Sequence, residues 1–214
     1  MTRSSIAAVI AAMTVAACGG SPAAPHGPTT ANVAVQPADV PSAMVKCDLS
    51  GDINNFIKQE QTPDPNASKT TATEWQDAKK NGATNAYVAL YTDSSQHCSA
   101  VKSSSADLSA ATYKLVVNFV IQFKDEKSAV TGYKSDNTVF GFSASTLRSG
   151  GNAVQEGTAT GLTANSIVLS RPVGDQTFYI AVWQNKAFMV ILAILNLDPA
   201  ASKKVASAEN GRIK

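Results

Sequence analysis

The stretch FMVILAIL, residues 188–195, decides the fold, because none of its side chains is polar. It is too short to cross a bilayer as a helix. The preceding WQNKAF, residues 183–188, is typical of a hairpin turn, and the strand-like TFYIAVW, residues 177–183, comes just before it. We therefore predict that 188–195 is a central strand covered on both faces.

Further strands and helices can be placed around this centre. KLVVNFVIQF, residues 114–123, alternates between a fully apolar face and a face that carries Asn118 and Gln122. SIVLSRPV, residues 166–173, and NAYVALYTD, residues 85–93, have the composition of strands. Helices are predicted over residues 52–60, 71–82, 94–104, 126–135 and 199–214. These elements predict an α+β fold, an antiparallel sheet with flanking helices packed mainly on one of its faces.

Two of these helices depend on specific residues. Thr71 and Glu74 have the spacing of a capping box, which predicts that the second helix begins there. In the last helix, Ala201, Val205 and Ala208 recur at helical spacing. They predict the face that this helix turns toward the sheet.

A short internal similarity connects two of the strands. The pattern Tyr-Val-x-x-Tyr-x-Asp that ends at Asp93 returns as Phe-Val-x-x-Phe-x-Asp ending at Asp125. Either the fold has two related β-α halves or the similarity arose by chance. Asp93, Asp125 and Asp198 each follow a strand-like stretch, and their carboxylates are predicted to cap the following helix. A catalytic pair of carboxylates is the alternative.

The first residues have the features of an export signal. Arg3 precedes the apolar IAAVIAAMTVAA, residues 6–17, which is too short for a membrane span. Val15-Ala16-Ala17-Cys18 resembles the lipobox of bacterial lipoproteins, in which the cysteine becomes the new N-terminus and carries acyl chains. The resemblance implies lipidation at Cys18 and an extracytoplasmic chain, lipid-anchored to the bacterial cell membrane or envelope. An ordinary secretory leader cleaved near Ala17 is the alternative.

The composition divides the chain into three parts. Residues 1–17 form the lipoprotein signal peptide. Residues 18–44 are rich in Pro, Ala and Gly, and are predicted to be the lipidated cysteine and a flexible tether. Residues 45–214 are predicted to form a single α+β globular domain.

The two remaining cysteines, Cys47 and Cys98, are an even pair in an exported chain. They predict a disulfide, which would restrict the unfolded chain by about 4 kcal/mol in the entropy model. A redox or metal site that includes His97 is the alternative. A zinc site needs about four ligands, and these residues lack the usual spacing. We therefore predict no metal site and no cofactor.

Charge and motifs exclude several function classes. Removing residues 1–17 removes only Arg3, which leaves 17 basic against 16 acidic side chains and no basic field for nucleic acid. The sequence contains no GxSxG, no GxxxxGK[ST], no GxGxxG after a strand and no HExxH. A nucleophilic triad would have to use His97.

A candidate surface for a ligand or partner lies on the strands. Tyr179 and Trp183 alternate with other large apolar residues, and could line a groove with Asn118 and Gln122 for a small apolar or amphipathic ligand. The alternative is that the two aromatic rings pack beneath a helix.

Three functions are compatible with these observations. The first is a membrane-anchored, non-enzymatic, sensor-like domain that binds an unknown small molecule or an envelope protein; the tether, the disulfide and the missing catalytic motifs favour it. The second is an envelope hydrolase or cell-wall modifying enzyme that uses carboxylates brought together by the fold. The third is a passive structural lipoprotein, which would have no pocket.

Overall fold

The computed structural model describes residues 27–103, 111–135 and 139–214. The predicted signal peptide, residues 1–17, and the lipobox-like stretch that ends at Cys18 lie outside the described residues. The strands are β1 (Val45–Lys46), β2 (Gly51–Asp52), β3 (Ala83–Thr92), β4 (Leu115–Phe123), β5 (Val154–Glu156), β6 (Ser166–Val173), β7 (Gln176–Asn185) and β8 (Phe188–Leu195). They form one antiparallel sheet in the order β1-β3-β4-β8-β7-β6-β5, with β2 also paired to β3.

Strand β8 is at the centre of this sheet, between β4 and β7, and all eight of its residues are buried. Its residues alternate between two apolar clusters, one on each face of the sheet. Met189 and Ile191 belong to the first cluster, whereas Val190 and Leu192 belong to the second. The prediction of a central strand covered on both faces is therefore confirmed.

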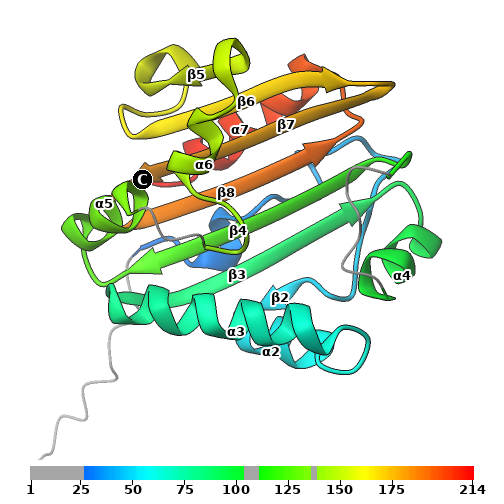
Figure 1. The fold of residues 1–214 in the computed structure, drawn as a ribbon, viewed down its shortest axis with the longest axis horizontal. Coiled ribbons are helices and arrows are strands. Elements are labelled where there is room, and N and C mark those ends of the chain that lie inside the picture. The colour runs from blue at the N-terminus through cyan, green and yellow to red at the C-terminus, as the bar shows by residue number, and fades with distance from the viewer. Residues whose placement is uncertain (1–26, 104–110, 136–138) are drawn as a thin grey trace, which may run out of the picture.

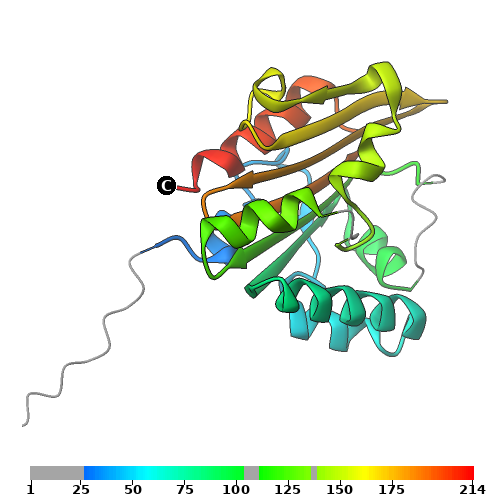
Figure 2. The same ribbon diagram turned by 60° about the vertical axis from the view of Figure 1, so that its left-hand side comes forward.

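The helices lie mainly on one face of the sheet. They are α1 (Thr30–Val33), α2 (Ile53–Glu60), α3 (Pro65–Lys80), α4 (Ser95–Ser103), α5 (Glu126–Lys134), α6 (Ala144–Arg148) and α7 (Pro199–Gly211). In Figure 1, α2 to α6 lie in front of the sheet, while α1 and α7 lie behind it. Figure 2 shows α7 and α3 on opposite sides of the strands. The predicted α+β fold with flanking helices is confirmed.

Helix α3 begins earlier than the sequence analysis predicted. It starts at Pro65, and the carboxylate of Asp64 accepts a hydrogen bond from the backbone N–H of Ala67. Asp followed by Pro is a strong start signal, because aspartate caps the first turn and proline fits its first position. The predicted capping box of Thr71 and Glu74 is wrong, since both residues lie inside the helix.

The internal similarity does not extend to the way the side chains point. Tyr87 packs against the cluster on the α7 face, whereas Phe119, its counterpart in the repeated pattern, belongs to the cluster on the α3 face. The register pairs Tyr87 with Val120 instead. Related halves would place matching residues on the same face, so the arrangement favours chance similarity.

The N-terminal part of the described chain belongs to the fold. Val33, Ala34 and Val35 are fully buried in the cluster on the α7 face, and Val40 and Met44 are nearly so. The sequence analysis placed this segment in a flexible tether, and it is wrong for these residues. The high proline content of this segment led to the tether prediction. Its short apolar runs nevertheless pack on the α7 face of the sheet, and their burial stabilises that face.

Candidate functional site

A groove of about 410 Å³ opens on the face of the sheet that α2 and α3 partly cover. It lies between these two helices and the turn of residues 139–142, which precedes α6. It is lined by Phe56, Glu60, Asp64, Asn66, Ala67, Thr70, Thr71, Glu74, Phe119, Phe140 and Gly141. Aromatic rings and carboxylates therefore meet in one place, and none of these residues is basic.

Three phenylalanines make the apolar part of the groove. The rings of Phe119, on the central strand β4, and Phe140 are stacked with their centroids 4.2 Å apart. Phe56 of α2 meets Phe119 edge to face at 5.9 Å. Each ring keeps 6% or 7% of its surface exposed. The negative faces of such rings attract organic cations.

The turn that carries Phe140 is held in a costly conformation. Val139 and Phe142 pair across it with hydrogen bonds of 2.8 and 3.1 Å. Phe140 has φ +54° and Gly141 has φ +79°, the left-handed conformation of a type I′ turn. A bulky residue with positive φ costs about 1–3 kcal/mol, and such strain is concentrated at functional sites.

Carboxylates surround the aromatic rings. Glu74 of α3 accepts a hydrogen bond from the backbone N–H of Gly141 and so ties the turn to this helix. Burial raises the pKa of Glu60 to about 7; the hydroxyl of Thr71, which donates to it, lowers the pKa, and the nearby Asp64 raises it. Glu60 therefore changes its charge near neutral pH, and a bound cation would favour its ionised form.

The four residues predicted to form a binding surface do not share one. Asn118 and Trp183 are fully buried, Tyr179 is 3% exposed, and Gln122 is half-buried at the far end of β4. Trp183 and Tyr179 belong to the cluster that also contains the inner face of α7. This arrangement agrees with the alternative that the rings pack beneath a helix. Tyr179 lines a pocket on the opposite face from the groove.

Asn118 has a structural task at the centre of the sheet. Its Oδ1 accepts a hydrogen bond from the backbone N–H of Val35, and its Nδ2 donates to Oε1 of Glu209 and to the carbonyl oxygen of Ile191. Glu209 is fully buried, and its Oε2 has no hydrogen-bond partner among the described residues. Burial raises the pKa of Glu209 well above the usual value of 4.5. Burial therefore favours the protonated, neutral form of this carboxyl group in the folded protein.

Arg212 follows α7 and holds the N-terminal segment in place. Its guanidinium donates to the carbonyl oxygens of Val33 and Ala34, and it forms a bidentate pair with Asp39 at 2.8 and 3.0 Å. Tyr91 fixes the same segment by donating its hydroxyl to the carbonyl oxygen of Val35. These contacts explain why the segment is ordered against the sheet.

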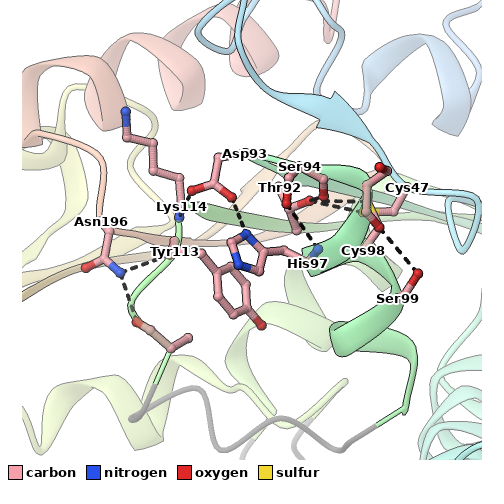
Figure 3. Close-up of polar contacts among 12 residues, drawn as sticks. Cys47, Thr92, Asp93, Ser94, His97, Cys98, Ser99, Tyr113, Lys114 and Asn196 are labelled. Carbon is pink, nitrogen blue, oxygen red and sulfur yellow. Dashed lines mark hydrogen bonds and ion pairs between the residues drawn. A yellow bond between two sulfur atoms is a disulfide. The ribbon is translucent and has the colours of Figure 1, made fainter.

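Cys47 and Cys98 form the predicted disulfide, which joins the residue after β1 to α4. The neighbouring His97 lies against Asp93 and Tyr113 in Figure 3, where its Nδ1 is hydrogen-bonded to the carboxylate of Asp93 and its ring stacks on Tyr113. The other oxygen of Asp93 accepts the backbone N–H of Lys114. The two hydrogen bonds lower the pKa of Asp93 despite the opposing effect of burial.

This His97–Asp93 pair fixes the chain where β4 begins. Asn196 supports the same place, since its Nδ2 donates to the carbonyl oxygens of Ala111 and Tyr113 (Figure 3). A catalytic histidine would contact a nucleophile through its other ring nitrogen, Nε2. Within the described ranges, no hydroxyl or thiol is hydrogen-bonded to Nε2 of His97. The pair is therefore assigned a structural role.

The three predicted aspartate caps have different outcomes. Asp125 accepts the N–H of Ser128, and Asp198 accepts those of Ala200 and Ala201, so both predictions are confirmed. Asp93 does not cap α4. The hydroxyl of Ser94 accepts the N–H of His97 instead, which leaves Asp93 to bind His97 and Lys114.

The groove residues were missed by sequence reasoning because they come from three separate segments of the chain, residues 56–74, Phe119 and residues 140–141. Phe119 was placed correctly on the apolar face of its strand, but that pattern indicates core. Glu60 was assigned only to the end of a helix. Gly141 gives one local signal, since glycine is a common turn residue and readily takes a positive φ.

Comparisons of the chain with protein-family models, curated proteins and solved structures found no match. Over the part of the chain that the structure describes, no helix is long and apolar enough to cross a membrane. In the same part, no three His, Cys, Asp or Glu side chains are grouped so that they could hold a metal ion.

Proposed function

We propose that this chain is a membrane-anchored, extracytoplasmic binding domain whose groove takes a small organic ammonium ligand. The observation that carries the proposal is the meeting of three phenylalanine rings with acidic side chains in a groove lined by no basic residue. Aromatic faces bind alkylated ammonium groups by cation–π attraction, and carboxylates add the opposite charge. The strained turn at Phe140 supports the proposal, because it holds one ring over the groove.

The ligand test uses choline and its neutral isostere 3,3-dimethyl-1-butanol, which differ in charge but hardly in shape. Binding to the folded domain is measured by calorimetry and by amide shifts in NMR spectra. We expect saturable binding of choline, with shifts at Phe119 and Gly141, and much weaker binding of the isostere. Equal binding of the two compounds, or shifts away from the groove, would refute the proposal.

Variants assign the contributions of the rings and the charge. Phe140→Leu keeps an apolar side chain but removes the aromatic face, and should weaken choline binding about two- to thirtyfold. Glu60→Gln should weaken it at least about fivefold at pH 8, where the native side chain is mostly ionised. Glu126→Gln, which removes an exposed carboxylate from α5, is the control and should have no effect.

The pH dependence follows from the raised pKa of Glu60. Between pH 6 and pH 8 this side chain loses its proton, and the resulting charge attracts the ligand. Choline should therefore bind more tightly at pH 8 than at pH 6, with a proton released on binding at pH 6. Titrations of Glu60→Gln should show little pH dependence. A native protein that binds equally at both values would exclude Glu60 from the site.

The anchor is proposed from the lipobox resemblance at Cys18. Intact mass of the chain extracted from its own membrane tests it. A chain that starts at Cys18 and carries acyl mass supports the anchor, whereas an unlipidated terminus near that position contradicts it. This result does not depend on the ligand test.

A hydrolase that uses Glu60 as a general acid is the second candidate. A carboxyl group with a pKa of about 7 in a groove is suited to proton transfer at neutral pH. Asp64 and Glu74, however, already accept backbone N–H groups of α3 and of the turn. Binding is therefore the better-supported function. Mass spectrometry of cell-wall fragments incubated with the native protein and with Glu60→Gln distinguishes the two.

A further inference from the structure

A second pocket lies on the opposite face of the sheet from the ammonium groove. It has a volume of about 300 Å³ and is found where β6 and β7 meet the start of α7. Ser170, Pro172, Tyr179, Leu197, Pro199 and Ser202 are among the residues that line it. Its walls are thus mostly apolar, with hydroxyl groups from β6, β7 and α7.

The hydroxyl of Thr177, which also lines the pocket, donates to the carbonyl oxygen of Leu197, but the other three hydroxyls have no partner among the described residues. Oγ of Ser202 is fully buried and makes no hydrogen bond. The hydroxyls of Ser170 and Tyr179 likewise make none within the described part of the chain. Tyr91, on the same face, shows the usual arrangement, because its hydroxyl donates to the carbonyl oxygen of Val35 at 2.9 Å. Buried polar groups normally have such a partner, so the fully buried, unpartnered hydroxyl of Ser202 indicates a missing one.

Arg171 is the only charged residue among the described residues that line the pocket. The alternation along β6 places its Cβ on the other face, with Ile167 and Leu169, and Arg171 makes no hydrogen bond to the pocket's hydroxyls within that part of the chain. Burial alone raises the pKa of Tyr179 to about 12, with no charged side chain contributing. A cation that entered would lose its hydration and find no carboxylate in the described lining. The hydroxyls and the apolar walls therefore suit a neutral group, and Arg171 is the reason why an anion has to be tested against it.

From these observations we infer that this pocket binds a small neutral molecule with an apolar body and an oxygen-bearing group, of the ester or alcohol class. The hydroxyls of Tyr179 and Ser202 would hydrogen-bond that group, and Pro172, Leu197 and Pro199 would contact the apolar body. The pocket is independent of the ammonium groove, since the sheet separates them.

The probe is ethyl butyrate, compared with butyrate and butylamine, which carry a negative and a positive charge on a similar chain. We expect saturable binding of the ester, with NMR shifts at Tyr179, Leu197 and Ser202, and weaker binding of both ions. Tyr179→Phe and Ser202→Ala should each weaken ester binding about two- to tenfold. Preferential binding of butyrate would overturn the proposal in favour of an anion site. Ester binding that neither variant changes would overturn it as well.

Thermal unfolding without any probe gives a second, independent readout. Ser202→Ala removes an unpartnered hydroxyl and should leave the melting temperature unchanged or raise it. Tyr91→Phe removes a partnered hydroxyl, and should lower the melting temperature while leaving ester binding unchanged. A lower melting temperature for Ser202→Ala would show that its hydroxyl is already satisfied, and the inference would fail.

Discussion

Replacing Glu209 with glutamine tests whether burial raises the pKa of this carboxyl group in the folded protein. Glu209 is fully buried on α7, and one of its oxygens accepts a hydrogen bond from Asn118. Glutamine has nearly the same shape and can accept that bond, but it has no proton to lose. The substitution therefore isolates the titration of the buried carboxyl group.

The sign and size of the effect follow from proton linkage. Because burial raises the pKa of Glu209 above the unfolded value of 4.5, the folded state holds the proton more tightly. The contribution of this group to stability is complete below pH 4.5 and is lost as pH rises toward the folded-state pKa. The loss is about 1.4 kcal/mol for each pH unit. Glu209→Gln has no such loss.

The assay is urea unfolding of both proteins at intervals between pH 4 and pH 8. Relative to the native protein, Glu209→Gln should become more stable as pH rises above 4.5, by about 1.4 kcal/mol per pH unit until the folded-state pKa is reached and by a constant amount beyond it. Glu126→Gln, at an exposed position, should show no comparable trend. A difference between Glu209→Gln and native protein that is the same at every pH would show that Glu209 titrates alike in both states, and would refute the reasoning.

Two further variants, one without the disulfide and one without Asn118, test other parts of the core. Replacing both Cys47 and Cys98 with alanine should lower the free energy of unfolding by about 4 kcal/mol, because it opens a loop with a sequence separation of 51 residues. A decrease of less than about 1 kcal/mol, measured by urea unfolding, would contradict this entropy estimate. Asn118→Leu leaves Val35 N–H and Glu209 without their partner, and should cost about 2–4 kcal/mol. A neutral result for Asn118→Leu would mean that water reaches this network.

The sheet could be predicted from sequence because its signals are local. The apolar run 188–195 reflects burial on two faces, and the alternation in 114–123 marks the apolar face of β4 that carries Phe119. Each signal appears within a single strand, although the other face of β4, with Asn118, is buried as well. The disulfide followed from counting cysteines in an exported chain. In each case the physical cause lies within the residues that show the pattern.

The helix faces and the groove could not be predicted in this way. The sequence analysis expected α7 to bury the face that carries Ala201, Val205 and Ala208. The buried face is rotated by about one residue and consists of Ser202, Val205, Ala206 and Glu209. A buried glutamate is tolerated there because Asn118, 91 residues earlier in the chain, supplies a partner. The groove likewise depends on the contact of Phe140 with Phe119 across the fold. Such pairings are decided by tertiary structure.

The hydrogen bond from Arg212 to the carbonyl oxygen of Val33 brings the first and last described segments of the chain together at one end of the domain. In Figure 2 the start of the described chain and the C-terminal label lie close together. A circular permutant that joins Lys214 to Gly27 by a short linker, and opens the chain at Gly174 between β6 and β7, should therefore keep the same sheet. A protein fused after Lys214 would therefore emerge beside residues 27–34 and share that end of the domain with the N-terminal segment.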